Sequence, residues 1–207
     1  MKRLLLVDDH AVVRQGLRTL LEQAGYAIVA EAESGEQAYI AWQLQRPDLV
    51  LLDLDMPGMG GLETLQRILA QDAATRILVF TMYDDTIHAA RAIRAGARGY
   101  VVKSEDPEVL LEAVQQILAG KRFIGHEIAQ QIAIEQSSGQ NSPIDALSQR
   151  EFEVFSRLIA GESLSEISRH LNISPKSVAN IQTQIRQKLD VQSTSQMVHI
   201  AMSHGIL

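Results

Sequence analysis

The sequence predicts an α/β domain with a doubly wound parallel sheet, followed by a smaller all-α domain. Three observations predict this order. Short apolar runs alternate with helical patterns in the first 120 residues, the final part of the chain shows only helical patterns, and the polar stretch QSSGQNSP separates the two parts. We therefore expect domains at 1–120 and 146–207, joined by a linker at 121–145.

Five apolar runs are the expected strands of the first domain. They are short and rich in Leu, Val and Ile, which is typical of strands covered on both faces of a parallel sheet. Helical spacing fills the intervals, as at Leu17 and Leu21, and Asp106 with Pro107 is a good helix start. This alternation predicts a (βα)5 fold. The expected strands are 4–7, 27–30, 49–52, 77–80 and 100–102.

Four short helices are expected in the second domain. S-x-x-E capping boxes at 148–151 and 163–166 open the first two. A third helix has Ser174 as its N-cap and Pro175 as its first residue and runs to about Leu189, and a fourth spans 195–203. Short helices joined by tight turns are compatible with a helix-turn-helix module.

Composition excludes several classes of protein. The chain has no cysteine, so disulfides, cysteine nucleophiles and thiolate metal sites are excluded. The six histidines show no ligand spacing, and we expect no zinc site from them. The apolar run at 4–7 is too short for a signal peptide or a membrane span, so we expect a cytoplasmic protein that does not contact a membrane.

The net charge of -6 is unevenly distributed. Residues 1–120 hold 11 Lys and Arg against 17 Asp and Glu, whereas residues 146–207 hold 6 against 5. A strongly acidic chain would disfavour nucleic acid, because Lys and Arg supply most of the affinity for phosphates. Here the acidity belongs to the first domain, and the second domain remains a candidate for binding DNA.

Polar residues directly follow four expected strands: Asp8 and Asp9, Asp53, Thr81, and Lys103. The carboxyl ends of parallel strands meet at one edge of a sheet, which gathers these side chains. Neighbouring carboxylates repel unless a cation neutralises them, and Mg²⁺ prefers such oxygen ligands. A hydroxyl and an ammonium suit the oxygens of a phosphoryl group. Asp53 is then a nucleophile that forms an aspartyl-phosphate.

The motifs LLLVDDH, LVLLDLDMPGMGGLE, LVFTMYDD and GARGYVVKS resemble, in this order, those of a bacterial two-component receiver domain with a flavodoxin-like fold. They cover nearly all of residues 1–120. The resemblance implies that a sensor histidine kinase phosphorylates Asp53. It also implies an Mg²⁺ site made by Asp8 through water, Asp9, Asp53 and the backbone carbonyl of Asp55.

The same resemblance implies a switch. Thr81 and Lys103 bind the phosphoryl oxygens, and Thr81 moves toward them, which leaves room for the ring of Tyr100 to turn inward. The alternative for Tyr100 is an ordinary, half-buried strand aromatic. Met82, with Asp55 and Tyr83, is expected to change the lifetime of the aspartyl-phosphate. The residues leave open whether the lifetime becomes longer or shorter.

A phosphohydrolase of the haloacid dehalogenase type is the enzymatic alternative, because Asp53 and Asp55 form a D-x-D motif after a strand. Those enzymes carry this motif near the start of the domain, with Thr or Val two residues after it. They also carry a further acidic pair after the lysine. In this chain the acidic pair, Asp8 and Asp9, lies upstream, and residue 57 is Pro. Continuous release of phosphate from small esters would distinguish the hydrolase. We therefore expect a protein that is not an enzyme.

The third helix of the second domain has a cationic outward face. Its apolar residues recur at 178, 181, 185 and 189 and are expected to pack inward. Residues 174–189 contain three cations and no acid. Such a helix suits the DNA major groove, where Lys meets guanine or phosphate and Asn pairs with adenine.

The segment LSQREFEVFSRLIAGESLSEISRHLNISPKSVANIQTQIRQKLDV resembles the LuxR-type helix-turn-helix of NarL/FixJ-family response regulators. The resemblance implies sequence-specific binding of double-stranded promoter DNA, with 174–189 as the recognition helix. Ala179 and Ile181 stand where many relatives carry Lys and His, so the target sequence cannot be transferred from them. The expected base or near-base contacts are Lys176, Asn180 and Thr183, and the expected phosphate contacts are Ser174 and Lys188.

Such modules usually bind paired half-sites as homodimers, so we expect phosphorylation of Asp53 to control dimerisation, DNA binding and transcription. Residues 196, 197, 200 and 201 are candidates for the interface, with core packing of Met197 and Ile200 as the alternative. In the linker, 126–135 is an expected helix on the receiver and 136–143 an expected flexible segment. The rival from another class is a phosphorylation-sensing protein-interaction module, which would show no salt-dependent affinity for DNA.

Overall fold

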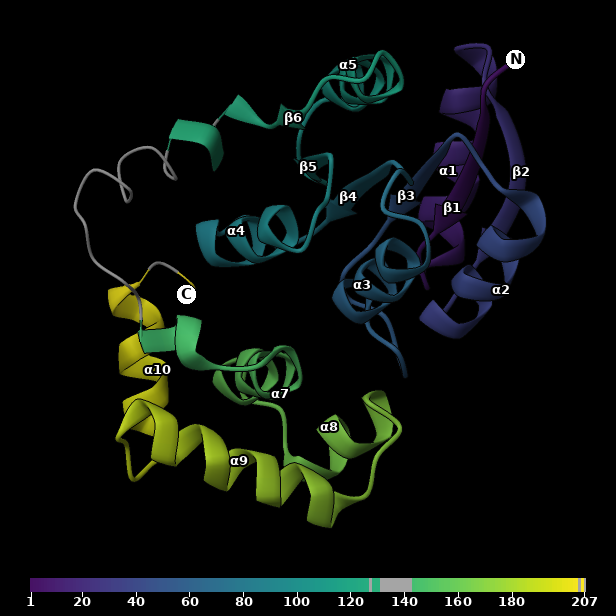
Figure 1. Cartoon of the computed structure of the whole chain (residues 1–207). Coiled ribbons are helices and arrows are strands. Elements are labelled where there is room, and N and C mark those ends of the chain that lie inside the picture. Colours follow the sequence, from purple (N-terminus) through teal and green to yellow (C-terminus); the bar gives the residue numbers. More distant parts are fainter. Residues whose placement is uncertain (127, 131–142, 205, 207) are drawn as a thin grey trace. The chain divides into compact units, whose positions relative to one another are not determined.

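The computed structural model describes residues 1–126, 128–130, 143–204 and 206. The chain forms two compact units, Met1–Ile132 and Ala133–Leu207. Figure 1 shows the first as a sheet with helices and the second as a group of helices alone. In the described parts of the chain, we find no helix with the length and apolar content that crossing a membrane requires. Each unit is described by itself.

The first unit is built on a parallel sheet with the strand order β2-β1-β3-β4-β5-β6. The five predicted strands are confirmed, four of them within one residue at each end. β6 was not predicted, because its two residues are too few to form an apolar run. The strands are β1 (Arg3–Val7), β2 (Ala27–Ala32), β3 (Leu49–Leu52), β4 (Ile77–Thr81), β5 (Gly99–Val102) and β6 (Phe123–Ile124).

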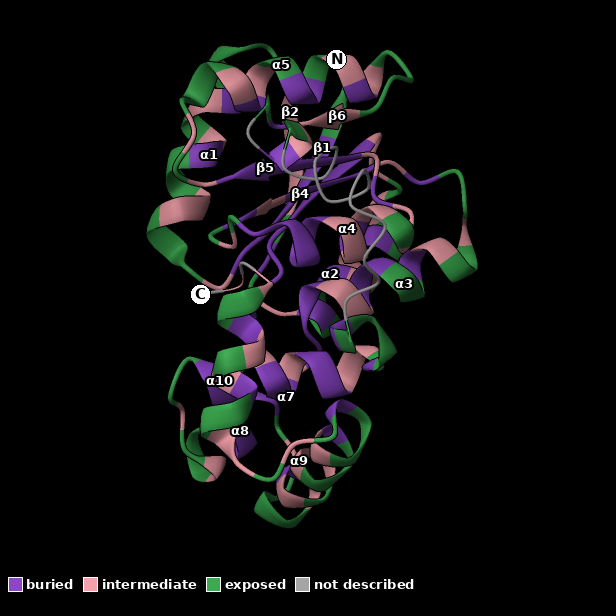
Figure 2. Cartoon of the chain, turned by 90° about the vertical axis from the view of Figure 1, so that its left-hand side faces the viewer, coloured by how far each residue is buried: buried purple, intermediate pink, exposed green. Residues whose placement is uncertain are grey.

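Helices cover both faces of this sheet, as the alternating pattern predicts. Leu4 and Leu6 of β1 pack with α1 and α5, whereas Leu5 and Val7 pack with α2, α3 and α4, because successive side chains of a strand point to opposite faces. Figure 2 shows the strands largely buried and the helices exposed on their outer sides. The helices are α1 (Ala11–Gln23), α2 (Gly35–Gln45), α3 (Gly61–Gln71), α4 (Thr86–Arg94) and α5 (Pro107–Leu118).

The first unit extends beyond the predicted boundary at residue 120. The N–H of Phe123 donates to the carbonyl of Arg98, and Gly125 donates to Tyr100, which attaches β6 to the sheet edge. Residues 126 and 128–130 are helical, and Ile128 is 2% exposed in the core beside β5. The start of the predicted linker is therefore part of the first domain. The rest of the predicted helix and the segment 136–142 lie outside the described residues.

The second unit contains the four predicted helices and a short 3-10 turn, η1 (Pro143–Ala146). The predicted capping boxes of the first two helices are present, and Ser193 with Gln196 forms a third that was not predicted. Asn172 takes a positive φ of 51°, which turns the chain sharply between the second and third helices. The helices are α7 (Gln149–Ile159), α8 (Leu164–His170), α9 (Pro175–Leu189) and α10 (Thr194–Ser203).

The core of the second unit includes residues that were candidates for a dimer interface. Met197 and Ala201 of α10 are fully buried, and they lie in a domain whose core also contains Phe155 of α7. For Met197 the alternative of core packing is therefore confirmed. Gln196 and Met202 are exposed on α10.

Candidate functional site

The predicted acidic pocket is present at the carboxyl edge of the sheet. Asp8 follows β1 and Asp53 follows β3, and these strands are hydrogen-bonded neighbours with Val7 paired to Leu52. The two carboxylates are 1% and 2% exposed. Lys103, which follows β5, places its Nζ 2.6 Å from Asp53 Oδ2 and 2.7 Å from Asp8 Oδ2. The sheet thus brings three residues that are distant in sequence into one ion cluster.

The charges of this cluster do not balance, because two buried carboxylates share the single ammonium of Lys103. Burial raises the pKa of Asp53 above its ordinary value, although Lys103 opposes this rise. Burial alone would lower the pKa of Lys103, but its attraction to Asp53 and Asp8 outweighs burial and raises that pKa. Lys103 is therefore a permanent cation, and the pocket retains an excess negative charge that a further cation can neutralise.

The donor set fits Mg²⁺. One ligand atom from each of Asp8, Asp9, His10 and Asp53 lies within 4.8 Å of all the others. Three of the four donors are carboxylates, the hard oxygen ligands that Mg²⁺ prefers. The Nδ1 atom of His10 lies 2.8 Å from Asp9 Oδ1, so this histidine joins the group although its sequence spacing had indicated no ligand.

Three further residues, which the sequence did not indicate, support the loops of the pocket. Arg14 donates to the backbone carbonyl of Asp8 at 2.6 Å, and Glu36 Oε1 accepts from the N–H of Met59 at 3.0 Å, which ties the loop after β3 to α2. A Cβ atom at Gly61 would lie 1.9 Å from the carbonyl of Asp53, so only glycine permits this close packing. The contact of Glu36 with Met59 joins residues 23 apart in the sequence, which no local motif reveals.

The predicted switch residues lie next to the pocket. Thr81, the last residue of β4, is fully buried, and its Oγ1 accepts a 3.5 Å hydrogen bond from the N–H of Tyr83. The ring of Tyr100 is also fully buried, so its interpretation as a half-buried aromatic is wrong. Its hydroxyl donates to the carbonyl of Tyr83 at 2.8 Å. Burial raises the pKa of Tyr100 well above its ordinary value, and the phenol therefore stays a neutral donor. Met82 is 66% exposed.

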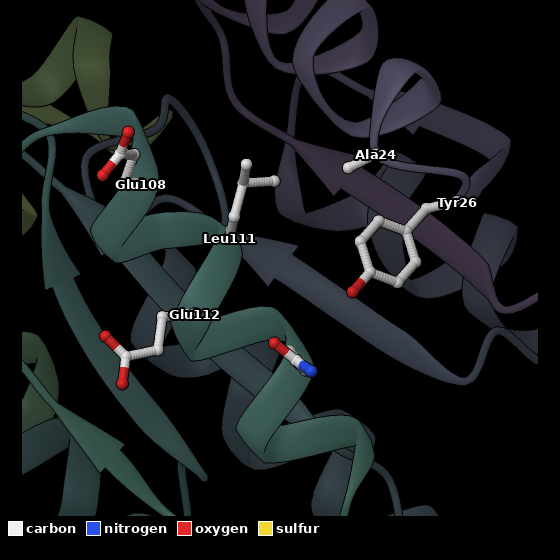
Figure 3. A pocket seen from close by; sticks show the side chains of 6 residues that line it. Ala24, Tyr26, Glu108, Leu111 and Glu112 are labelled. Atoms are coloured by element: carbon white, nitrogen blue, oxygen red, sulfur yellow. The ribbon is translucent and has the colours of Figure 1, made fainter.

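A hollow of about 450 Å³ lies away from this pocket, between the end of α1 and the face of α5 (Figure 3). None of the predicted site residues lines it. Its lining includes two carboxylates and a tyrosine but no lysine or arginine, whereas the ion cluster of the pocket contains Lys103. The lining residues are Ala24, Tyr26, Glu108, Leu111, Glu112 and Gln115.

The predicted recognition helix, α9, has the expected two faces. Val178 and Ile185 are fully buried, whereas Lys176, Asn180 and Thr183 are exposed together on the opposite side. Ser174 lies at the predicted N-cap position, where its side chain accepts from the N–H of Ser177. The exposed side of the helix thus presents one ammonium, one amide and one hydroxyl near its N-terminal half.

Lys188 has a partner inside its own domain. Its Nζ lies 2.7 Å from Glu151 Oε2 and donates to the carbonyl of Ala146 at 3.2 Å. Glu151 is 6% exposed and also accepts from the N–H of Ser148 in the capping box. Burial would raise the pKa of Glu151, but the bonds from Lys188 and Ser148 outweigh it and lower that pKa. The role of Lys188 as a phosphate contact stays a prediction.

The pairing of Glu151 predicts a pH-dependent stability. Because its folded pKa is depressed, its contribution is present above the unfolded value of about 4.3 and is lost as the pH falls through the folded pKa. Glu151→Gln keeps an acceptor but removes the charge, and we expect it to lower the free energy of unfolding at neutral pH by about 1 kcal/mol. Thermal unfolding of the full chain at a series of pH values measures this.

Glu153→Gln is the matched control, since Glu153 lies on the same helix and forms a partly exposed ion pair with Arg150. It should change stability by less than about 0.5 kcal/mol. Equal losses for both variants, or a loss for Glu151→Gln that persists unchanged at acidic pH, would contradict the assigned ion pair.

The fold and the two sites define the class of this protein. A carboxylate pocket at the edge of a flavodoxin-like sheet is joined to a helical domain with an exposed cationic helix, which is the organisation of a response regulator with a DNA-binding output domain. Family models agree: residues 4–115 match the response regulator receiver domain, and residues 145–201 match bacterial regulatory proteins of the luxR family. The chain belongs to the NarL/FixJ family of two-component response regulators. It is a phosphorylation-controlled, DNA-binding regulator of transcription.

Individual relatives match along the whole chain or most of it. The response regulator UvrY of Escherichia coli (strain K12) is 36% identical over 100% of this chain and 96% of its own length. The transcriptional activator protein ExaE of Pseudomonas putida is 39% identical over 99% and 97%. A two-component response regulator of the LuxR family from Aurantimonas sp. SI85-9A1 has a crystal structure that is 47% identical, with a TM-score of 0.64, and covers 66% of this chain and 99% of its own.

Proposed function

We propose that Asp53 is the phosphoacceptor and that a sensor histidine kinase is the donor. The supporting observation is the buried Asp53 carboxylate, which shares the Lys103 ammonium with Asp8 at the edge where the strands converge. An oxygen of Asp53 attacks the phosphorus of the phosphohistidine. The bond from phosphorus to the donor nitrogen breaks, and its electron pair leaves with the imidazole, so that the product is an aspartyl-phosphate.

The residues around Asp53 bind the metal ion and the oxygens of the phosphoryl group. Asp8 through water, Asp9, Asp53 and the carbonyl of Asp55 hold Mg²⁺, which neutralises charge on the transferred group when it is bound. Lys103 binds a phosphoryl oxygen after leaving its ion pair with Asp53. Thr81 donates its hydroxyl to another, since it ends the neighbouring strand β4.

The chain then acts as a two-state switch. Phosphorylation moves Thr81 toward the phosphoryl group and favours the buried position of the Tyr100 ring, which shifts the population toward a homodimer that binds paired half-sites on promoter DNA. The protein turns over no substrate and works in the cytoplasm, where its DNA target lies. The exposed side of α9 binds the DNA, with base contacts from Lys176, Asn180 and Thr183 and phosphate contacts from Ser174 and Lys188.

Lys176→Ala tests the DNA interface. Because Lys176 is exposed on α9 and forms no ion pair that we observe in the described structure, its charge is available to DNA. We expect the variant to weaken binding to mixed-sequence duplex DNA by about 1 kcal/mol, or roughly fivefold, and to reduce the salt slope by about one. Fluorescence anisotropy over a range of salt concentrations measures both quantities.

Gln184→Ala is the control for Lys176→Ala, since Gln184 is an exposed, neutral residue of the same helix. It should leave the salt slope unchanged. If the wild-type chain bound duplex DNA with no dependence on salt, the protein-interaction alternative would replace this proposal. Continuous release of phosphate from small esters would instead favour the hydrolase.

A further inference from the structure

The buried hydroxyl of Tyr100 depends on a single backbone carbonyl in the loop between β4 and α4. This carbonyl belongs to Tyr83, and the hydrogen bond measures 2.8 Å. A buried phenol that loses its partner pays the full cost of its lost hydration, so the carbonyl must stay in place for the ring to remain inside. Residues 82–85 form neither helix nor strand. Other contacts must therefore hold Tyr83.

His88, in the first turn of α4, makes one of these contacts and is itself held by Asp85. Its ring stacks on the ring of Tyr83 with 3.9 Å between centroids and an interplanar angle of 4°. Its Nδ1 lies 2.6 Å from Asp85 Oδ2. Since a carboxylate only accepts, Nδ1 carries the proton of this bond. The side chain of His88 is 8% exposed and that of Asp85 is 7% exposed.

Asp85 fixes the orientation of His88 relative to the helix. Its Oδ1 accepts from the N–H groups of Ile87 and His88, at 3.1 Å and 2.9 Å, and so caps α4. Its second oxygen remains for the imidazole. One carboxylate thus joins the start of α4 to the His88 ring, and the ring joins α4 to Tyr83.

We propose that His88 is a positioning residue of the switch: held by Asp85, its ring fixes Tyr83 and keeps in place the carbonyl that receives the buried Tyr100 hydroxyl. His88 belongs to none of the motifs that mark the site in the sequence. The inference rests on the proposed role of Tyr100 in the switch, because it explains what stabilises the inward position of that ring. Loss of the His88 ring shifts the Tyr100 ring toward solvent and leaves the phosphorylation of Asp53 unchanged.

Fluorine NMR of the full chain labelled with 3-fluorotyrosine tests this directly. The chain has four tyrosines, so each signal can be assigned by a single Tyr→Phe variant. A soluble neutral nitroxide broadens the signals of exposed rings. For His88→Ala we expect broadening of the Tyr100 signal to rise about tenfold, as a minor outward state becomes well populated. The signals of Tyr26 and Tyr39 should stay unchanged, which shows that the domain is folded.

Three variants separate the parts of the contact. His88→Phe keeps a ring for stacking and should restore most of the protection of Tyr100. His88→Asn keeps a polar bond to Asp85 without an aromatic ring and should behave like His88→Ala. His126→Ala, at an exposed histidine of the same unit, should resemble the wild type. Full protection of Tyr100 in His88→Ala and His88→Asn would overturn the proposal, as would a Phe variant that behaves like the Ala variant.

A second measurement separates this inference from the proposed switch. Phosphorylation of Asp53, followed by intact mass, should be the same in wild type and His88→Asn, while the DNA affinity of the phosphorylated variant should fall. If Tyr100 becomes accessible but DNA affinity does not change, the positioning role of His88 stands and the role of Tyr100 in the switch is wrong. If Tyr100 stays protected, the positioning role is wrong whatever the DNA affinity.

Discussion

Asp53→Asn should abolish phosphorylation while leaving the fold intact and slightly more stable at neutral pH. The amide is a poor nucleophile, so no aspartyl-phosphate forms. The gain in stability follows from the charge imbalance of the pocket, where Asp8 and Asp53 share the ammonium of Lys103. Removing one buried carboxylate leaves a balanced pair, and we expect the free energy of unfolding to rise by about 1 kcal/mol.

The sign of the pH dependence follows from the raised pKa of Asp53. Between its unfolded value of about 4 and its higher folded value, the folded state binds more protons than the unfolded state. The contribution of Asp53 to stability therefore falls as the pH rises through this window, and the full cost remains above it. The stability advantage of Asp53→Asn should shrink as the pH is lowered toward about 4.

Intact mass after incubation with a small acyl phosphate and Mg²⁺ measures phosphorylation, and thermal unfolding at several pH values measures stability. Asp106→Asn is the matched control, because Asp106 is an exposed carboxylate of the same unit that forms no part of the proposed site. It should still take up one phosphoryl group. A phosphorylated Asp53→Asn chain would show that the acceptor is elsewhere, and a clear loss of stability would contradict the charge imbalance.

Lys103→Met should have the largest effect on stability. It removes the only lysine or arginine charge that we observe beside Asp8 and Asp53 in the described structure and leaves two carboxylates buried side by side. Breaking a buried ion pair in this way typically costs about 3–5 kcal/mol, and we expect a loss of that size in the first domain. The pKa of Asp53 should rise further for the same reason.

Mg²⁺ should restore part of the stability that Lys103→Met loses, because a ligand that binds only the folded state stabilises it. Urea unfolding with and without Mg²⁺ measures this, and chelation should reverse the gain. Lys121→Met, at an exposed cation of the same unit, is the control and should be nearly neutral. If Lys103→Met lost no more stability than this control, Lys103 would not be the charge partner of the pocket.

Much of the site was predictable because it depends on where strands end. Asp8, Asp53 and Lys103 each follow a buried apolar run, and parallel strands bring such positions together regardless of the details of packing. The recognition helix was predictable for a similar reason: its Ser-Pro start and its apolar spacing are local. Each of these signals is formed by residues that lie close together in the sequence.

Other features escaped the sequence because they depend on single contacts. β6 has only two residues, Phe123–Ile124, and exists because the edge of β5 offers it hydrogen bonds. Lys188 looks like a free surface cation in the sequence, yet it pairs with Glu151, 37 residues away. His88 showed no motif, and only the folded loop brings its ring against Tyr83.

The sequence by itself thus determined the two-domain order, the family and the polar residues that gather at the strand ends, since periodicity, caps and strand ends are encoded by neighbouring residues. Only the tertiary structure decided which groups far apart in the sequence share a charge or a hydrogen bond. Lys103 and Asp53 are 50 residues apart, and Tyr100 and Tyr83 are 17 apart. Contacts of less than 3 Å across such separations depend on how the elements pack, because an error of one rotamer or one helical turn would remove them.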